Sequence, residues 1–380
     1  MRLDAEHEMF REAVAEMVAD RVAPIAAEVD ESDRFPEELI EVFGDMGLLQ
    51  LAVPEDYGGP GGDLTSTCIA REEIARGGLT GLGQLGGQCG VFVQPLLNFG
   101  TEEQKQRFLP EIAKGRSLTC LAMSEPDAGS DPAAMRTRAV KDGSSWVING
   151  QKSYITWGSV AKYALVMART NDQPRGAGIS AFIVDTATPG FVVGAQDRKM
   201  GQHGVPNVSL FFEDLRVPEE NMLGEDGKGF RAALRSLHIN RPTIGAMGIG
   251  GAQAALDYAI AYCEQREIKG RPVAGFQGLR WMIAEAATQL EAARCLVYEV
   301  ARQFDAGVPH DELVTISSMA KAFAADVCMA VTTTCVQLLG GAGYMRDHPV
   351  ERLFRDAKLI AILEGTTEIQ KEIIARGVIG

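Results

Sequence analysis

The sequence predicts an α+β protein with a helical N-terminal domain, a middle antiparallel β domain and a C-terminal helical bundle. Three observations predict this class. The spacing of apolar residues is helical up to about residue 116, strand-like from about 117 to 223, and helical again from 229 onward. A length of 380 residues allows two or three domains. We expect them at residues 1–118, 119–225 and 226–380.

Helical spacing is clear in three parts of the N-terminal region. Val14, Val18 and Val22 recur every four residues and predict one apolar helix face. Residues 63–76 and 102–112 also have a helical period. Each begins near a residue suited to cap a helix, which is Asp63 in the first and Thr101 in the second. These segments predict a helical domain.

The middle region contains short runs rich in β-branched and aromatic residues, which predict strands. They lie at residues 163–168, 179–184, 191–193 and 208–212. Asn149-Gly150 predicts a tight hairpin turn, because both residue types tolerate positive φ angles. Together the runs predict a compact antiparallel sheet or barrel.

Long helical segments follow, and Pro309 and Pro349 mark two of the breaks between them. Apolar faces on helices of this length predict a bundle. The segments cover residues 230–264, 277–305, 311–339, 350–362 and 366–375.

Composition excludes several classes of protein. Lys and Arg total 37 against 51 Asp and Glu, a net charge of −14. Such a surface repels nucleic acid and anionic membranes, so we expect neither as a partner. The N-terminus lacks an apolar signal core, and the seven cysteines form no CxxC pair. We therefore expect a cytoplasmic protein with free thiols and no metal site.

Common nucleotide and hydrolase motifs are absent from the sequence. Residues 248–251 contain Gly-Ile-Gly-Gly but lack the third glycine of a dinucleotide fingerprint, so they predict close helix packing. No GxSxG elbow is present either. Composition and periodicity alone lead only to a soluble protein with a cleft between its domains.

Three segments carry a resemblance to a known family. They are LAMSEPDAGSD at 121–131, NGQKSYIT at 149–156, and a C-terminal set formed by QLLGGAGY at 337–344, RDAK at 355–358 and LEGTTEIQ at 363–370. Weaker matches lie at 53–59, 212–218 and 265–277. Together they closely resemble the acyl-CoA dehydrogenase family over essentially the whole chain, in order and at family spacing.

The resemblance implies an acyl-CoA dehydrogenase-like fold with a β-barrel-like middle domain and a four-helix-type bundle. It implies FAD held between these two parts, in a homotetramer whose neighbouring subunit touches the adenosine end. The implied reaction, a step of fatty acid metabolism, oxidises an acyl-CoA to the trans-2-enoyl-CoA. A base takes the α-proton, flavin N5 takes the β-hydride, and an electron-transferring flavoprotein receives the electrons.

The resemblance assigns the base to Glu364. A carboxylate in an apolar cleft has a raised pKa, which makes it a better base near neutral pH. Another interpretation is that Glu364 caps the following helix. Both hold if Thr366 or Thr367 is the cap and Glu364 projects into the cleft. Some relatives place the base beside Arg241, but Asn240 stands there and cannot act as a carboxylate base.

Other site residues follow from the same resemblance. The implied cofactor-binding residues are Met123, Ser124, Tyr154 and Thr156 around the flavin ring, and Arg266, Gln277, Gln337, Gly341, Thr366 and Glu368 around the pyrophosphate and adenosine, some from a neighbouring subunit. The implied substrate-binding residues are Ser130, Arg241 and Gly365. Without the resemblance, residues 124–131 are a polar turn, Tyr154 is strand packing and Arg266 is a solvated charge at a helix end.

The sequence departs from the family pattern at Trp157, Lys269 and His203, and residues 81–90 are unusually rich in glycine. These departures leave acyl-chain preference and cofactor packing open. Three functions remain as alternatives on the same fold. They are a flavin oxidase, a dehydrogenase of carrier-protein-bound acyl groups, and a non-catalytic binding protein.

Overall fold

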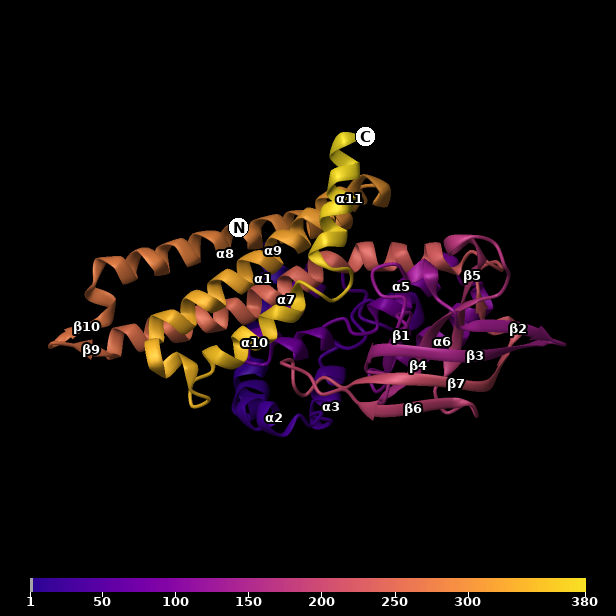
Figure 1. Ribbon diagram of the computed structural model, residues 1–380, viewed down its shortest axis with the longest axis horizontal. Coiled ribbons are helices and arrows are strands. Elements are labelled where there is room, and N and C mark those ends of the chain that lie inside the picture. The colour runs from indigo at the N-terminus through magenta and orange to yellow at the C-terminus, as the bar shows by residue number, and fades with distance from the viewer. Residues whose placement is uncertain (1–2) are drawn as a thin grey trace.

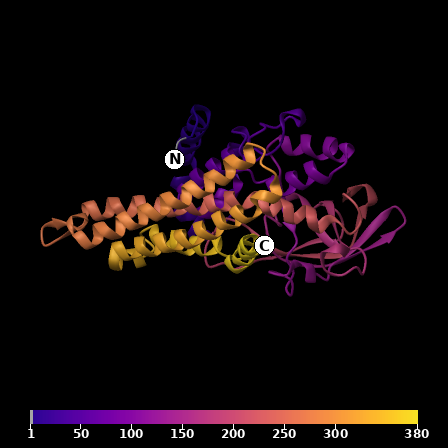
Figure 2. The same ribbon diagram turned by 90° about the horizontal axis from the view of Figure 1, so that it is seen from above.

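The computed structural model describes residues 3–380 and is elongated (Figure 1). Long helices of the C-terminal region run along its length, and the β domain lies towards one end. The N-terminal helices lie along one side of these long helices, as Figure 2 shows from above. The predicted order of a helical region, a β region and a helical region is confirmed.

The N-terminal region is helical, as its apolar spacing predicts. Val14, Val18 and Val22 are buried on one face. The helix that carries them passes into a π-helical turn at Val18–Val22. The α-helices of this region are α1 (Ala5–Met17), α2 (Ala26–Ser32), α3 (Glu38–Asp45), α4 (Leu64–Arg76), α5 (Gly90–Phe99) and α6 (Glu102–Ala113).

Helix α4 has two acidic groups at its N-terminus. Asp63 is the predicted cap and accepts a hydrogen bond from the Ser66 N–H at 2.7 Å. Asp305, from the distant end of helix α8 (Gln277–Asp305), accepts the N–H groups of Leu64 and Thr65 at 2.8 and 2.9 Å. These N–H groups have no partner within the helix, so carboxylates stabilise them well.

The middle region forms an eight-stranded sheet in the order β6-β7-β3-β2-β4-β5-β8, with β1 paired to β4. Most neighbours are antiparallel, whereas β1 runs parallel to β4. The strands are β1 (Leu118–Ala122), β2 (Arg138–Asp142), β3 (Ser145–Thr156), β4 (Ala161–Arg169), β5 (Ile179–Asp185), β6 (Phe191–Gln196), β7 (Asn207–Pro218) and β8 (Met222–Leu223).

The hairpin predicted at Asn149-Gly150 is wrong, because β3 continues through both residues. The turn lies earlier, at Gly143, between β2 and β3. Asn149 instead lies opposite a bulge in β7. Its side chain accepts a hydrogen bond from the Asp214 N–H at 2.8 Å and donates to Asp214 Oδ1 at 3.0 Å. The Asn side chain therefore satisfies a bulge rather than forming a turn.

The C-terminal region is a bundle, as predicted. The bounds of α8 are those expected, and the other helices differ from expectation only near their ends. Gly250, inside α7, confirms the close packing predicted for residues 248–251, because an added Cβ would meet Glu72 O at 2.0 Å. The other helices are α7 (Gly229–Gln265), α9 (His310–Leu339), α10 (Val350–Ile360) and α11 (Thr367–Ile379).

Helix α9 is the central helix of this bundle and contacts α7, α8, α10 and α11. Within the described residues, the segment His310–Tyr344 is long and apolar enough to cross a membrane, with a hydropathy of 1.6 over its most apolar window. Yet 56% of that window is buried inside the protein. Packing on several sides accounts for this apolar character, as expected of a helix that is hydrophobic all round.

Candidate active site

Glu364 lies in the short connection between α10 and α11, and its backbone is left-handed. Its φ angle is 52°, and that of Gly365 is 95°. A left-handed conformation costs a residue with a Cβ about 1–2 kcal/mol, so the surroundings must hold Glu364 in place. Gly365 has no such cost. An added Cβ there would also lie 2.7 Å from Gln370 Nε2, so the Gln370 side chain would have to move.

Two buried side chains hold this connection. Gln370 Nε2 donates to Gly365 O at 2.9 Å, and Lys321 Nζ donates to the same carbonyl at 2.8 Å. Thr366 caps α11 by accepting from the Ile369 N–H at 3.5 Å. The helix cap is therefore Thr366, and the Glu364 side chain is left for another role.

The Glu364 carboxyl group is held from one side only. Its Oε1 accepts a hydrogen bond from Asn240 Nδ2 at 2.5 Å. Its Oε2 is buried and has no hydrogen-bond partner among residues 3–380. Thr243 Oγ1 lies 2.7 Å from Asn240 O and 2.9 Å from Asn240 Oδ1, so its one proton is shared between two acceptors. The second contact favours the amide orientation in which the NH₂ group faces Glu364. Asn240 is not a base, as predicted, but it contacts the proposed base directly.

Burial raises the pKa of Glu364 above its ordinary value. The positive charge of Arg71, the hydrogen bond from Asn240 and the charges of Lys321 and Arg241 act in the opposite direction. Part of the residue reaches the surface, but the unpartnered oxygen does not. The result is a desolvated carboxylate that is more basic than an exposed one.

Arg241 and Lys321 bring positive charge to the carboxylate from α7 and α9. Arg241 is buried, and its Nη1 donates to Ser318 Oγ at 2.8 Å. Burial lowers the pKa of Arg241 to about 10 and that of Lys321 to about 8. The structure thus places Arg241, a predicted substrate-binding residue, beside the proposed base.

The predicted flavin-ring residues gather on neighbouring segments of the β domain. Met123 and Ser124 follow β1, while Tyr154 and Thr156 lie on β3. The Ser153 N–H donates to Ser124 O at 2.9 Å and joins the two segments.

A buried lysine adds a second link between these segments. Lys152 Nζ donates to Met123 O at 3.1 Å and forms an ion pair with Glu125 at 2.8 Å. Tyr154 is 71% exposed, so strand packing does not explain it. Its aromatic face is available to a ligand.

The predicted pyrophosphate and adenosine residues are not all brought together. Thr366 and Glu368 begin α11, close to Glu364 in the chain. The others are exposed and lie at the end of the bundle away from the β domain, where the β9–β10 hairpin is labelled in Figure 1. They are Arg266, Gln277, Gln337 and Gly341. A second copy of the chain would have to supply them to a flavin bound at the β domain.

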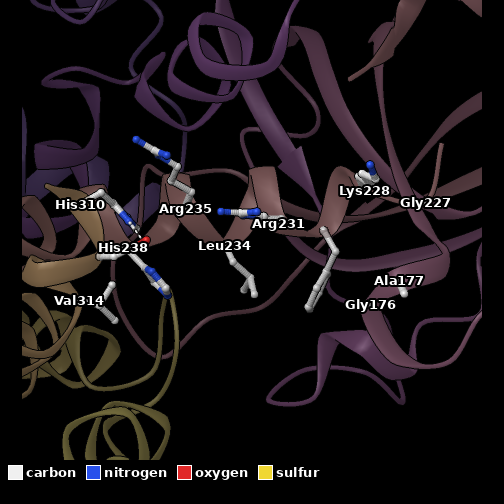
Figure 3. A pocket seen from close by; sticks show the side chains of 12 residues that line it. Gly176, Ala177, Gly227, Lys228, Arg231, Leu234, Arg235, His238, His310 and Val314 are labelled. Atoms are coloured by element: carbon white, nitrogen blue, oxygen red, sulfur yellow. Dashed lines mark hydrogen bonds and ion pairs between the residues drawn. The ribbon is translucent and has the colours of Figure 1, made fainter. Parts of the chain in front are cut away.

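A basic cavity of about 490 Å³ lies where α7 begins, beside the connection between β4 and β5 (Figure 3). Lys228, Arg231 and Arg235 line it along α7, together with His238 and His310, whose stacked rings lie 5.4 Å apart. Burial lowers the pKa of His238 to about 3, so this ring is neutral. This cavity is not among the features predicted from the sequence. The available signal is the spacing of the basic residues at 228, 231 and 235, which places them on one helix face.

Ser130 is exposed and lines neither this cavity nor the one described next. It precedes the turn Pro132–Ala134. Arg169 donates both to Ala133 O in that turn, at 2.8 Å, and to Arg175 O, at 3.1 Å. This arginine therefore links the Ser130 segment to the rim of the basic cavity at Gly176.

A second, inner cavity of about 270 Å³ reaches Asn240. It lies between α4, α5 and α7, where Thr67, Gly87, Gly90 and Ile239 also line it. The inner cavity therefore lies next to the amide that holds Glu364, within the helical part of the protein.

The three departures from the family pattern have separate structural settings. Trp157 is buried against Phe35, with ring centroids 5.5 Å apart. His203 Nδ1 lies 2.7 Å from Asp30 O. Lys269 occupies the turn between β9 (Glu267–Ile268) and β10 (Arg271–Pro272) with a φ of 53°. None of the three lines either cavity.

Comparison with known proteins identifies the family. Its N-terminal domain profile matches residues 4–116, its middle domain profile 120–215 and its C-terminal domain profile 227–379, each described as a domain of acyl-CoA dehydrogenase. The chain therefore belongs to the acyl-CoA dehydrogenase family. Proteins of this family are FAD-dependent oxidoreductases that act on CH–CH groups.

Individual relatives match over almost their whole length. The chain is 44% identical to a probable acyl-CoA dehydrogenase, FadE25, of Mycobacterium tuberculosis, over 100% of this chain and 96% of that protein. It is 42% identical to a short-chain specific acyl-CoA dehydrogenase of Clostridium acetobutylicum, over 98% of each. The solved structure of butyryl-CoA dehydrogenase from Megasphaera elsdenii is similar with a TM-score of 0.96 and 36% identity, over 100% of both chains.

Proposed function

We propose that this protein dehydrogenates an acyl-CoA thioester between its α and β carbons, with Glu364 as the base for the α-proton. The observation that carries the proposal is the desolvated Glu364 carboxyl group with one unpartnered oxygen. A general base needs a raised pKa and a free oxygen that can reach the proton. Because the other oxygen is fixed by Asn240, the free oxygen is held in one orientation.

The backbone around Glu364 supports a second role. Within the described chain, the Glu364 N–H donates no hydrogen bond, and the left-handed backbone keeps it out of the helices on both sides. Removal of an α-proton places negative charge on the thioester oxygen. A fixed N–H donor stabilises that charge. We infer that Glu364 supplies both the base and one donor for the thioester oxygen.

The residues of the β domain fit an FAD molecule, which supplies the acceptor for the β-hydrogen when it is bound. Tyr154 offers an exposed ring, and Ser124 and Thr156 offer hydroxyl groups on adjoining segments. Arg266 suits a pyrophosphate, and it forms no ion pair elsewhere in residues 3–380. Arg266 lies at the end of the bundle away from the β domain of its own chain, which supports a homo-oligomer. We propose a homotetramer, as the family resemblance implies.

The basic cavity suits the nucleotide part of CoA. The phosphates of CoA carry several negative charges, and Lys228, Arg231 and Arg235 supply positive ones. Asp311 is the acidic residue of the lining, and Glu225, outside it, pairs with Lys228. The concentration of basic side chains at one place supports binding of a polyanion by a protein that is acidic as a whole. We propose an electron-transferring flavoprotein as the acceptor for the electrons.

The test is anaerobic flavin bleaching by acyl-CoAs of graded length and branching. We expect one class to bleach the bound flavin rapidly. Glu364→Gln should slow bleaching by about 10²–10⁴-fold while FAD stays bound. Glu372→Gln, an exposed carboxylate on α11, is the matched control and should bleach at the wild-type rate.

Full activity of Glu364→Gln would show that another group is the base. Rapid peroxide formation in air would favour an oxidase instead of a dehydrogenase. No bleaching by any CoA thioester, with FAD demonstrably bound, would contradict the proposed substrate class and direct attention to carrier-bound acyl groups.

A further inference from the structure

Lys152, on β3, is a fully buried lysine whose ammonium group has two oxygen acceptors. Its Nζ donates to Met123 O at 3.1 Å and to Glu125 Oε1 at 2.8 Å. Burial lowers the pKa of Lys152 to about 8, although the Glu125 carboxylate acts in the opposite direction. A buried ion pair contributes little net stability, because both charges lose their hydration. This favours a role for the lysine in the geometry of the site.

The Glu125 carboxylate has other donors besides Lys152. Its Oε2 accepts a hydrogen bond from the Arg136 N–H at 2.6 Å, and its Oε1 accepts one from the Thr137 N–H at 3.0 Å. Glu125 therefore ties the segment after β1 to the segment that leads into β2 without the lysine. The contact that Lys152 alone supplies is the one to Met123 O, since no other donor in residues 3–380 reaches that carbonyl.

The position of the Met123 carbonyl sets the direction of the next N–H group. The peptide bond between Met123 and Ser124 is trans. In a trans peptide the C=O and the following N–H point in opposite directions. Because Lys152 holds Met123 O towards the interior, the Ser124 N–H points outwards. No group in residues 3–380 accepts a hydrogen bond from this N–H, and Ser124 is only half-buried. The result is a fixed backbone donor that is available to a ligand.

Strand β3 holds the other side of Ser124. The Ser153 N–H donates to Ser124 O at 2.9 Å, so the carbonyls on both sides of the free N–H are held. The next residue, Tyr154, has a φ of 59°, and the register of β3 with β7 shifts between Lys152 and Ile155. A bulge of this kind redirects a side chain, which agrees with the exposed ring of Tyr154. The free donor and the exposed ring therefore belong to two segments that are joined at this point.

We propose that Lys152 is a positioning residue for the flavin, because it directs the Ser124 N–H towards an electron-rich atom of the ring. The inference rests on the proposed function, since it takes this part of the β domain to bind FAD. The buried ammonium group acts through the Met123–Ser124 peptide. An N–H donor at the ring strengthens FAD binding, and it stabilises the reduced ring more than the oxidised ring, which is poorer in electrons. Lys152 therefore influences both the affinity for FAD and the reduction potential of the bound flavin.

Lys152→Met tests this role, because methionine fills similar space without a donor for Met123 O. The dissociation constant of FAD is measured from the fluorescence of flavin released on dilution of the holoenzyme. The midpoint potential of the bound flavin is measured by reductive titration. We expect the dissociation constant to rise at least about tenfold, the effect of losing one hydrogen bond. The midpoint potential should become more negative, because the reduced ring loses more stabilisation than the oxidised one.

Glu125→Gln is the matched control, because it breaks the same ion pair but leaves Lys152 able to donate to Met123 O. It should lower the melting temperature, while the dissociation constant of FAD stays within about twofold of the wild-type value. The double variant Lys152→Met with Glu125→Gln leaves no unpaired buried charge, so it carries the test if Lys152→Met alone does not fold. It should lose FAD affinity as Lys152→Met does.

The outcomes separate this inference from the proposed function. If the folded variants without Lys152 keep the wild-type affinity for FAD and the wild-type potential, the role of Lys152 is wrong and the proposed function stands. If Glu125→Gln loses as much FAD affinity as Lys152→Met, the effect belongs to the ion pair, and the positioning role is again wrong. If the wild-type protein binds no FAD, the proposed function fails, and the inference fails with it.

Discussion

The Asn240 amide donates to Glu364 Oε1 at 2.5 Å across two segments that are 124 residues apart in the sequence. Thr243, on the same helix, also contacts the oxygen of that amide. The base strength of Glu364 therefore depends on a neutral neighbour as well as on the surrounding cations. A hydrogen bond to a carboxylate favours its charged form and lowers its pKa.

Asn240→Ala should raise the pKa of Glu364 further, because it removes a hydrogen bond from the charged form while burial remains. The acidic limb of the pH profile of kcat/KM should move to higher pH. At pH 6 the bleaching rate should fall about tenfold, the effect of losing one hydrogen bond to a charged group. Thr243→Val should shift the limb in the same direction by less. An unmoved limb in folded Asn240→Ala would show that Asn240 has no influence on the base.

Gly365→Ala should lower both stability and activity. Gly365 has a φ of 95°, and an added Cβ would lie 2.7 Å from Gln370 Nε2, which holds the loop. We expect a loss of about 1–3 kcal/mol in the free energy of unfolding, measured by urea denaturation. Gly278→Ala, where an added Cβ meets nothing within 4 Å, is the control and should not be destabilised. Equal stability of both variants would contradict the strain at Gly365.

Arg266→Ala should weaken FAD binding, although Arg266 directly precedes β9 and Tyr154 lies on β3. Figure 1 shows β9 and β3 towards opposite ends of the molecule. Loss of a charge-assisted contact to a pyrophosphate should raise the dissociation constant at least about tenfold. The measurement is flavin per chain after gel filtration, with the oligomeric state read from light scattering. Arg280→Ala, an exposed arginine on α8, is the control. Full FAD retention in a monomeric protein would exclude a contribution from a second copy.

The buried Asp356 carboxyl should make the free energy of unfolding decrease as pH rises. Burial raises its pKa to about 6, compared with an ordinary value of 3.8, although it accepts a hydrogen bond from the Thr80 N–H at 3.1 Å. The folded state therefore binds the proton more tightly than the unfolded state does. This contribution is complete below about pH 4 and is lost as pH rises through about 6.

Asp356→Asn removes this titration and is the variant that tests it. The stability of the wild type relative to Asp356→Asn should fall by about 2 kcal/mol between pH 4 and pH 7. Urea unfolding at the two pH values measures it. Asp347→Asn, an exposed aspartate in the connection before α10, should show no such dependence. A pH-independent difference for Asp356→Asn would mean that Asp356 stays ionised in the folded protein.

The helices were predictable because their apolar faces repeat locally, as in α8. The role of Asn149 in the middle of a strand was not predictable, because the bulge that it faces lies in β7. Local turn chemistry gives no information about a strand that is distant in the sequence. The candidate site shows the same limit. Glu364 and Thr366 could be assigned from a continuous motif. Asn240 meets Glu364 only in the folded chain, and no spacing rule connects them.

The Asp305 carboxylate at the start of α4 also bears on how the chain is made. The N-terminal region leaves the ribosome long before α8 does. The N–H groups of Leu64 and Thr65 therefore lack their acceptor until Asp305 is synthesised, 241 and 240 residues later. Helix α4 carries Arg71 and lines the inner cavity through Thr67. Expression of residues 3–116 alone should therefore give an incompletely ordered α4, and the inner cavity should form only once synthesis has passed residue 305.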